Sequence, residues 1–237
     1  MLHGHPLEPG ATIQVRGEEA QHAARVKRLA EGDSIEILNG SGGVGAARIT
    51  RIAKTAGEWT IEVSIDAVEQ REPARPRVEV WSSAPKGPRL EDMIDGLSQA
   101  GCAMWRPLLC ERTVVDPREG KLSRLGRVAQ ESAKQCARAW VMEIGEAITF
   151  QAATATPPGT RVLIADAVGA SIGGALRPPM ERVVLLVGPE GGFSERELTH
   201  ALGLTRVCLG PHTMRIETAA VVGAAMLVAS IHEAPKG

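Results

Sequence analysis

The sequence predicts an α/β protein in two parts, a small β-barrel or sandwich followed by a larger α/β domain. Two observations lead to this prediction. Up to about residue 70, apolar and polar residues alternate in short stretches, as they do in half-buried strands. Beyond that point, short apolar runs alternate with segments of helical periodicity. With 43% hydrophobic and 23% charged residues, the 237-residue chain has the composition of a soluble globular protein.

The first part is expected to contain three strands, at 34–38, 44–52 and 59–67. An Asn-Gly pair at 39–40 favours a tight turn after the first of them. The stretch QREPARPR, residues 70–77, follows the third strand and contains two prolines and four charges. This composition is typical of a linker, so we expect a small domain at 1–72 and a second domain at 73–237.

The second part is expected to combine amphipathic helices with a buried parallel sheet. The segment RLEDMIDGLSQAG has apolar residues on one helical face, and Gly101 suits the end of that helix. The same spacing predicts a second helix over 122–136. Short apolar runs of the kind found in buried parallel strands occur at 78–82, 161–166, 182–187 and 206–210.

A further helix is predicted to begin just after Ser194. Ser194 and Glu197 have the spacing of a capping box, and Phe193 with Leu198 has the spacing of a hydrophobic staple across it. Gly203 lies where a C-cap glycine is expected.

The last predicted helix, 218–231, is apolar on all sides. We expect such a helix to be buried, either under the sheet or against a second subunit. The run is too short to span a bilayer, and the N-terminal residues show no basic region followed by an apolar core. The sequence therefore predicts no membrane segment and no signal peptide.

The cysteines are scattered, at Cys102, Cys110, Cys136 and Cys208. They form no CxxC pair, and no histidine lies at metal-ligand spacing from them. We expect no metal site, a reducing compartment, and a buried packing role for each thiol.

Charge is unevenly distributed although the net charge is only -1. Cations concentrate outside the C-terminal third, at 22–28, 47–54, 71–77 and 120–127. Each run taken singly is typical of a solvated face, while together they leave a local nucleic-acid surface open. Aromatic residues are only 3%, which argues against an RNA binder that relies on base stacking.

The stretch LLVGPEGGFSERE, residues 185–197, has the layout of a strand, a ligand-binding loop and a helix. A dinucleotide fingerprint beginning at Gly188 would need glycine where this chain has Glu190 and Phe193. A P-loop would need Gly-Lys-Ser/Thr before the helix, and none follows. A carboxylate at Glu190 would also repel a phosphate. The loop therefore suits a ligand other than a phosphate, or no ligand.

A second Gly-Pro turn ends the apolar run VCLGP at 207–211. Glycine lets a ligand approach the backbone closely, and proline fixes the direction in which the chain leaves. Two such turns at strand ends are able to line one pocket, and they are equally consistent with two ordinary strand exits.

Together, LLVGPEGGFSERE and LGPHTMRIETA resemble the C-terminal signature of the SPOUT-class, or trefoil-knotted, methyltransferases of the RsmE type. That signature reads approximately GPEGG-[FW]-[ST]-x-x-E and then LG-x-R-[IV]-L-R-x-ETA. Weaker similarity to this family extends over HAARVKRLAEGD, Lys86-Gly87, Pro107 with Glu111-Arg112, and KQCAR.

The resemblance implies an N-terminal PUA-like β-barrel that binds RNA and a C-terminal SPOUT trefoil-knotted α/β domain. It implies S-adenosylmethionine as the methyl donor and N3 of a uridine in small-subunit (16S) ribosomal RNA as the acceptor. It further implies a homodimer that acts on ribosomal RNA or the small ribosomal subunit. From the residues themselves, we expect a cytoplasmic protein with no metal and no membrane partner.

The resemblance also implies which residues bind the cofactor: glycine backbone would admit the adenosine, and apolar side chains would form walls for the adenine. For Glu190, two roles stay open, namely holding the loop by accepting backbone N–H bonds or contacting the ribose or amine of the cofactor. The candidate cofactor residues are Leu186, Val187, Gly188, Pro189, Glu190, Gly191, Leu209, Gly210, Met214 and Thr218.

Catalysis of methyl transfer rests mostly on positioning, and a nearby cation favours the deprotonated form of uridine N3. We assign this electrostatic role to Arg215, with Glu217 either orienting it or accepting a proton. In the alternative interpretation, these two residues form a structural pair that caps the following helix. His212 is either a proton carrier or a solvated loop histidine. The candidate RNA contacts, each of which is otherwise an exposed charge, are Arg28, Lys86, Arg112 and Arg138.

Three segments depart from the family pattern. The N-terminal MLHGHPLEP lacks the Arg-Phe-Phe opening, GLSQAG stands in place of K-A-T-E-L-G, and His212 and Thr213 stand near the first arginine of the second signature. These segments lie on the RNA or target side in the family picture. They motivate two alternatives, a diverged SPOUT protein that binds RNA or ribosomal particles without methylating, and a methyltransferase with a different RNA target. A Rossmann-type nucleotide-dependent enzyme is a third, disfavoured by Glu190 and Phe193.

Overall fold

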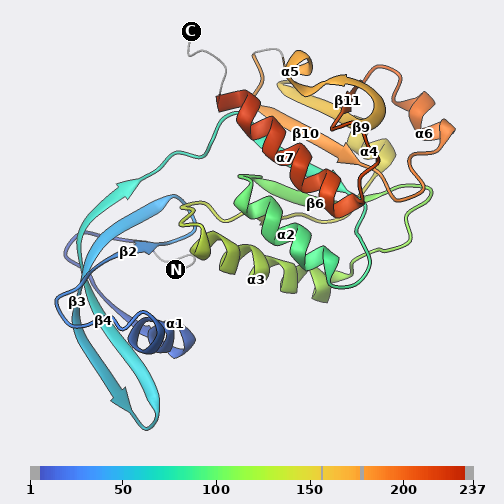
Figure 1. Ribbon diagram of the computed structural model, residues 1–237. Helices are drawn as coiled ribbons and strands as arrows, with labels where there is room; N and C mark the ends of the chain where they lie inside the picture. Colours follow the sequence, from blue (N-terminus) through green and yellow to red (C-terminus); the bar gives the residue numbers. More distant parts are fainter. Residues whose placement is uncertain (1–5, 156, 177–178, 233–237) are drawn as a thin grey trace. The chain divides into compact units, whose positions relative to one another are not determined.

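The computed structural model describes residues 6–155, 157–176 and 179–232, and the chain divides into two compact units (Figure 1). The smaller unit consists of Met1–Pro73 and Ala137–Trp140, and the larger one of Ala74–Cys136 and Val141–Gly237. Residues 137–140 join the smaller unit through hydrogen bonds and through the packing of Ala139 with Leu38 and Val44. The Trp140 indole donates to the carbonyl of Arg71 at 2.8 Å, and the amide of Gly42 donates to the carbonyl of Ala139 at 3.0 Å.

The smaller unit is built on one antiparallel sheet with strand order β1-β4-β3-β2. Its core contains Ile49, Val63 and Ile65 from the sheet and Ala20 from a short helix. The three predicted strands are confirmed, although two of them are longer than expected, and the first strand and the helix were not predicted. The elements are β1 Thr12–Arg16, α1 Gly17–Gln21, a π-helical turn His22–Val26, β2 Ser34–Leu38, β3 Gly43–Thr55 and β4 Glu58–Gln70.

The larger unit contains a parallel sheet with strand order β11-β9-β10-β5-β6-β7, and β8 also pairs with β6. The predicted α/β architecture is confirmed. Strands β6 to β8 were not predicted, because MWRPLL carries a proline and no alternation and the other two have two residues each. The elements are β5 Arg77–Ser82, α2 Arg89–Gln99, β6 Met104–Leu109, α3 Glu119–Gln135, β7 Glu143–Ile144, β8 Ile148–Thr149, α4 Phe150–Thr154, β9 Thr160–Ser171, α5 Ile172–Ala175, β10 Arg182–Val187, α6 Glu195–His200, β11 Thr205–Cys208 and α7 Ile216–His232.

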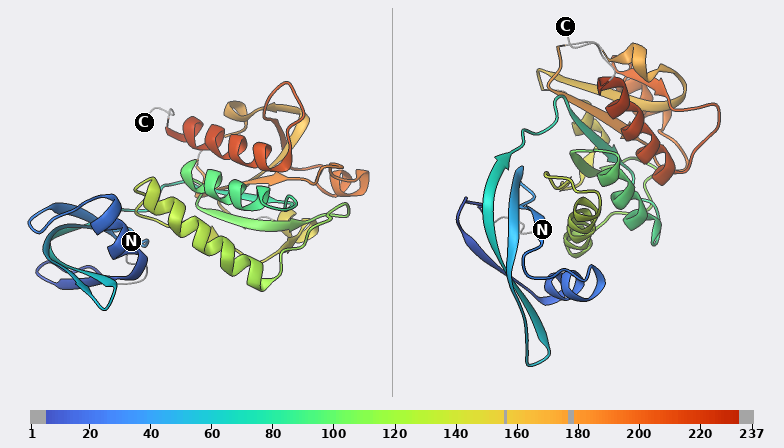
Figure 2. Two further views of the ribbon diagram at one scale, coloured as in Figure 1. Left: turned by 60° about the horizontal axis from the view of Figure 1, so that its bottom comes forward. Right: turned by 60° about the vertical axis from the view of Figure 1, so that its left-hand side comes forward.

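Helices cover both faces of this sheet (Figures 1 and 2). Successive residues of β10 point to opposite faces, so that Leu185 packs in the core beneath α2, α3 and α7, while Leu186 packs in the core on the α4 and α6 side. Both faces of the central strands are therefore buried, which explains why these strands read as continuous apolar runs.

Two helix ends follow from local sequence, and one does not. Gly101 has φ +89° and donates to the Ser98 carbonyl at 3.1 Å, while Cys102 donates to the Leu97 carbonyl at 3.0 Å, so α2 ends in a Schellman motif. The capping box at the start of α6 is present as predicted. The prediction for Gly203 was wrong: α6 ends at His200 with Ala201 as its C-cap.

The expectation that every thiol is buried was wrong for Cys136, which is exposed, whereas Cys102 is buried. Burial raises the pKa of the Cys110 thiol to about 12, and the nearby Glu197 carboxylate adds to this shift. Within the described ranges, no group of three or more His, Cys, Asp or Glu side chains has the arrangement of a metal site. None of the helices described here is both long and apolar enough to cross a membrane.

Candidate functional site

A pocket of 160 Å³ lies where residues 165–167 of β9 meet the loops that follow β10 and β11. The three strands are parallel neighbours, so their carboxyl ends lie at the same edge of the sheet. Of the two interpretations left open for the Gly-Pro turns, a shared pocket is the one that the structure shows. The lining residues are Ala165, Asp166, Ala167, Val187, Gly188, Pro189, Gly192, Phe193, Leu209, Gly210, His212, Thr213, Met214 and Ala219.

At two glycines of the pocket, a Cβ would make a tight contact with an apolar side chain. A Cβ at Gly188 would lie 3.1 Å from the ring of Phe193, and a Cβ at Gly210 would lie 3.0 Å from the Met214 methyl. Both glycines therefore let apolar side chains pack directly against the backbone.

The turn after β10 runs from Pro189 to Gly192 and is closed by a 2.8 Å hydrogen bond from the Gly192 amide to the Pro189 carbonyl. Gly192 has φ +69°, a left-handed conformation that favours glycine. Glu190 is exposed at the tip of this turn and makes no hydrogen bond with any residue that the structure describes.

Glu197, rather than Glu190, is the carboxylate that holds the loop in place. Its side chain is 6% exposed, and it accepts one backbone amide with each oxygen, from Ser194 at 2.8 Å and from Glu111 at 2.9 Å. The sequence analysis identified Glu197 only as part of a capping box. Its second partner comes from the loop after β6, which no local pattern indicates.

The turns after β10 and β11 form two walls of the pocket, and residues 165–167 of β9 form a third, which was not predicted. The pairing of β9 with β11 jumps by several residues between Arg206 and Val207, so that 165–169 leaves the regular ladder. Asp166 pairs with Arg206 at 3.3 Å and accepts the amide of Val168 at 3.1 Å, which holds the excursion against β11. An aspartate followed by small residues after an apolar run was the available sequence signal.

The predicted cofactor residues are only partly gathered at this pocket. Six of them line it, namely Val187, Gly188, Pro189, Leu209, Gly210 and Met214. Leu186 is buried in the core on the α4 side of the sheet. Glu190, Gly191 and Thr218 are exposed and do not belong to the lining.

Arg215 and Glu217 lie at the start of α7 but are not paired with each other among the described residues. Glu217 instead accepts a hydrogen bond from Arg89 of α2 at 3.3 Å. Its other carboxylate oxygen is buried without a hydrogen-bond partner. Arg215 is exposed, and only its carbonyl is engaged, by the amide of Ala219 at 2.8 Å. The geometry therefore contradicts both the capping pair and the direct orientation of Arg215 by Glu217.

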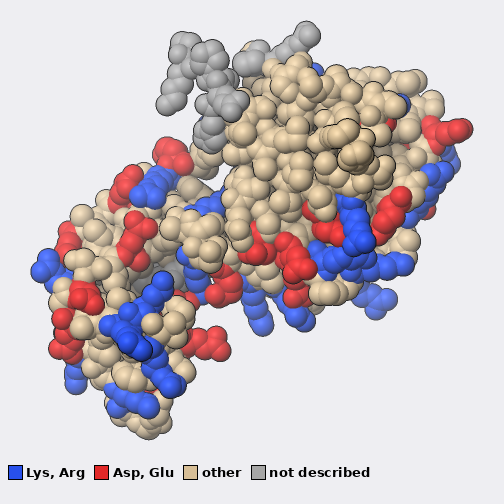
Figure 3. Space-filling model, in the orientation of Figure 1, with Lys and Arg blue, Asp and Glu red and all other residues tan. Residues whose placement is uncertain are grey.

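The candidate RNA contacts are distributed over both units. Arg28 and Arg138 belong to the smaller unit, and Arg28 has the left-handed φ of 55°. Lys86 and Arg112 are exposed in the larger unit, on the loops that follow β5 and β6. Lys and Arg side chains gather along the side of the larger unit that carries α3, interleaved with acidic ones (Figure 3).

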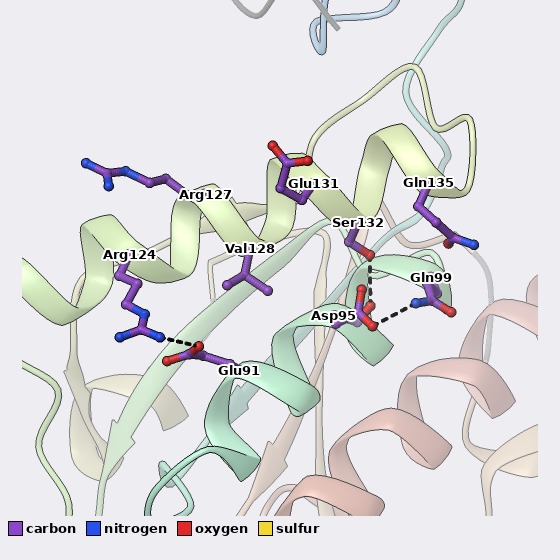
Figure 4. A pocket seen from close by; sticks show the side chains of 9 residues that line it. All are labelled: Glu91, Asp95, Gln99, Arg124, Arg127, Val128, Glu131, Ser132 and Gln135. Atoms are coloured by element: carbon purple, nitrogen blue, oxygen red, sulfur yellow. Dashed lines mark hydrogen bonds and ion pairs between the residues drawn. The ribbon is translucent and has the colours of Figure 1, made fainter. Parts of the chain in front are cut away.

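A wider hollow of 1030 Å³ lies between α2 and α3 (Figure 4). Its charges are largely matched: Glu91 pairs with Lys121 at 3.1 Å and with Arg124 at 3.0 Å. The hydrogen bond from Lys121 and the charges of both cations lower the pKa of the Glu91 carboxyl. Val128 is the one apolar side chain in the lining, so this hollow has the character of a solvated groove between two helices.

Comparison with known proteins agrees with this architecture. The family model for an RNA methyltransferase domain matches residues 71–228, and the family model for an RNA methyltransferase PUA domain matches residues 15–61. Ribosomal RNA small subunit methyltransferase E of Synechocystis is 31% identical, covering 92% of this chain and 73% of the relative. The protein of that name from Mycobacterium bovis is 30% identical, over 91% and 85%.

Solved structures share the fold. A methyltransferase from Legionella pneumophila, in complex with its cofactor SAM, is 25% identical and superposes with a TM-score of 0.78 over 96% of both chains. Ribosomal RNA small subunit methyltransferase E from Neisseria gonorrhoeae, bound to S-adenosyl methionine, is 24% identical with a TM-score of 0.80 over 95% and 94% of the two chains.

The turns of the GPEGG and LGPHTMRIETA segments line one pocket at the strand ends. The chain that carries them matches the methyltransferase and PUA family models over most of its length. The chain belongs to the RNA methyltransferase family that includes ribosomal RNA small subunit methyltransferase E.

Proposed function

We propose that this protein transfers a methyl group from S-adenosylmethionine to N3 of a uridine in small-subunit (16S) ribosomal RNA. One observation carries the proposal: the two turns of the family signature meet in one glycine-lined, mainly apolar pocket at the ends of three parallel strands. The relatives from Synechocystis and Mycobacterium bovis are named for methylation of this RNA, and the Legionella methyltransferase binds SAM. A cytoplasmic location follows from this substrate.

The residues present fit the adenosine part of such a cofactor. Leu209 and Met214 supply apolar walls, and Gly188 and Gly210 contribute backbone to the lining. An adenine ring is recognised by this combination of apolar contact and backbone donors and acceptors. When bound, S-adenosylmethionine supplies a methyl group on a sulfonium, and transfer to N3 breaks the S–CH₃ bond and leaves a neutral thioether.

Arg215 is proposed to stabilise the uridine anion. N3 must release its proton to the solvent before its electron pair attacks the methyl carbon, and a cation next to the base favours that deprotonated form. Arg215 is exposed and follows Met214 of the pocket lining directly, and no described acidic side chain neutralises it. It is therefore available to the substrate.

Glu217 is proposed to position the start of α7 rather than to accept the proton. One of its oxygens is held by Arg89 and the other is buried, so neither is open to a base in the pocket. As an acidic residue in the first turn, it also interacts favourably with the dipole of α7. The buried oxygen without a partner marks a place where the positioning of α7 is sensitive to substitution.

The trefoil knot implied by the resemblance is retained as a proposal. It is supported by the excursion 165–169 of β9, past which the chain of β11 runs in very close approach. The position of a Cβ on Gly169 is only 2.5 Å from backbone atoms of Val207. After β11, the chain returns across the sheet as α7, which contacts β5 and β10.

A homodimer is likewise proposed, with α7 at its interface. One side of α7 is buried against the sheet at Ala220 and Ala224, while the apolar or small residues Thr218, Ala225 and Ala229 on the other side are exposed. Light scattering should give twice the 25.1 kDa chain mass, and Ala225→Arg should halve it because a charge would be buried at the interface. Ala152→Arg, at an exposed position of α4, is the matched control. A monomeric native protein would contradict the dimer.

The proposed reaction is tested with small-subunit RNA from a strain that lacks the gene. The purified protein with S-adenosylmethionine is expected to introduce a block to reverse transcription at one uridine, because methylation of N3 prevents base pairing. The same block should be present in RNA from the parent strain and missing from the deletion strain. S-adenosylhomocysteine should compete with the methyl donor, whereas NAD should not.

Three outcomes would contradict the proposal, each differently. A block that persists in the deletion strain would assign the target to another enzyme. Binding of S-adenosylhomocysteine without methylation of any RNA would favour a diverged RNA-binding protein. Binding of NAD without S-adenosylhomocysteine would favour a nucleotide-dependent enzyme of the Rossmann type.

A further inference from the structure

The loop after β6 forms a tight turn whose backbone is fixed on several sides. The amide of Cys110 donates to Thr113 Oγ1 at 2.8 Å, and the amide of Thr113 donates to the Cys110 carbonyl at 3.0 Å. Between them, the amide of Glu111 donates to the buried carboxylate of Glu197 at 2.9 Å. The remaining residue of the turn, Arg112, therefore projects from a backbone that is already held in place.

Arg112 reaches the turn that precedes α6. Its Nη1 donates to the carbonyl oxygen of Gly191 at 2.6 Å, and its Cδ lies 3.3 Å from the position of a Cβ on Gly191. Gly191 lies between Pro189 and Gly192, both of which line the pocket. The arginine thus holds the middle of a turn whose two ends form the wall of the proposed cofactor pocket.

The guanidinium of Arg112 has unused binding capacity. It is exposed, and the Gly191 carbonyl takes one of its five N–H donors, with no acidic partner among the described residues. Arg206 and Arg89, by contrast, are paired with Asp166 and Glu217. A planar guanidinium with free donors binds a phosphate in a fork geometry, and a bond to a backbone carbonyl leaves that option open.

We propose that Arg112 is a positioning residue that bridges the two substrates: it binds a backbone phosphate of the RNA while it holds the Gly191 carbonyl. This inference rests on the proposed function. A bound phosphate orders the side chain, and an ordered side chain holds the Pro189–Gly192 turn in the conformation that lines the pocket. RNA binding therefore raises the affinity for the cofactor, and by linkage the cofactor raises the affinity for RNA by the same factor.

Calorimetry with S-adenosylhomocysteine, alone and with a saturating unmethylated transcript of the small-subunit RNA, tests this coupling. In the native protein, we expect RNA to tighten S-adenosylhomocysteine binding by about fivefold or more. Arg112→Ala should reduce that factor to about one, and Arg112→Lys should fall between, because an ammonium lacks the fork. The RNA affinity of Arg112→Ala should also depend less on salt, by about one unit in the log–log slope.

Arg196→Ala is the matched control, because Arg196 is an exposed arginine on α6 without a bond to the Pro189–Gly192 turn. It should leave the coupling factor unchanged. If the native protein shows no coupling, or if Arg112→Ala retains the native factor, the bridge is overturned. If S-adenosylhomocysteine does not bind the native protein at all, the proposed function fails before the bridge is tested, so the two failures are distinguishable.

Discussion

Arg215→Ala is expected to lower kcat for RNA methylation by about 10²–10³-fold while changing the Kd for S-adenosylhomocysteine by less than about twofold. The large effect on kcat follows because the cation acts on the anion that develops at uridine N3, which is present only on the reaction path. The small effect on Kd follows because Arg215 lies outside the pocket lining, between Met214 and Ile216. Steady-state kinetics at saturating RNA and S-adenosylmethionine would measure kcat, and calorimetry would measure the Kd.

Arg118→Ala serves as the control for Arg215→Ala. Arg118 is an exposed arginine at the N-cap of α3, so its loss removes an equal charge from the same unit without touching the pocket. We expect kcat to stay within about twofold of the native value, as for surface substitutions in general. Equal losses of kcat and cofactor affinity in Arg215→Ala would instead assign that residue a structural role in the loop.

Gly169→Ala is expected to destabilise the larger unit by about 3 kcal/mol, the upper part of the usual range for overpacking. The added methyl would lie 2.5 Å from backbone atoms of Val207, and a backbone cannot move aside as a flexible side chain can. Thermal unfolding of this unit should shift downward by roughly 6–12 °C. Differential scanning calorimetry would measure the shift.

Gly173→Ala is the matched control for Gly169→Ala, since a Cβ at Gly173 meets no atom within 4 Å. That variant should unfold at the native temperature or slightly above it, because alanine loses less backbone freedom than glycine on folding. A Gly169→Ala protein that unfolds within about 1 °C of the native one would show that β9 and β11 separate easily, which would also weaken the support for the knot.

Local patterns predicted those features whose causes are local. The capping box at Ser194, the Schellman glycine at position 101 and the apolar strand 182–187 each depend on a few neighbouring residues, and each is present in the structure. Gly203 failed because a glycine suits a C-cap only when the backbone there is left-handed, and helix α6 had already ended at His200. Strand β6 was missed because tertiary pairing tolerates Pro107 near its end.

The same distinction between local and tertiary causes applies to the candidate site. The Gly-Pro turns were visible in the sequence because glycine and proline carry backbone preferences, but the sequence left one shared pocket and two ordinary strand exits equally open. Three hydrogen bonds of the site join residues 79 to 128 positions apart in the chain: Glu111 to Glu197, Arg89 to Glu217, and Arg112 to Gly191. No periodicity relates such residues, so their pairing was outside the reach of sequence patterns.

By itself, the sequence determined the α/β class, the family signature and the presence of the two Gly-Pro turns, because periodicity and backbone preference act over short distances. Only the tertiary structure decided which carboxylate holds the loop, which arginine is available to the substrate and which segment forms the third wall. These depend on the order in which parallel strands pair: the position of β9 between β10 and β11 brings Asp166, Gly188 and Gly210 to one edge of the sheet.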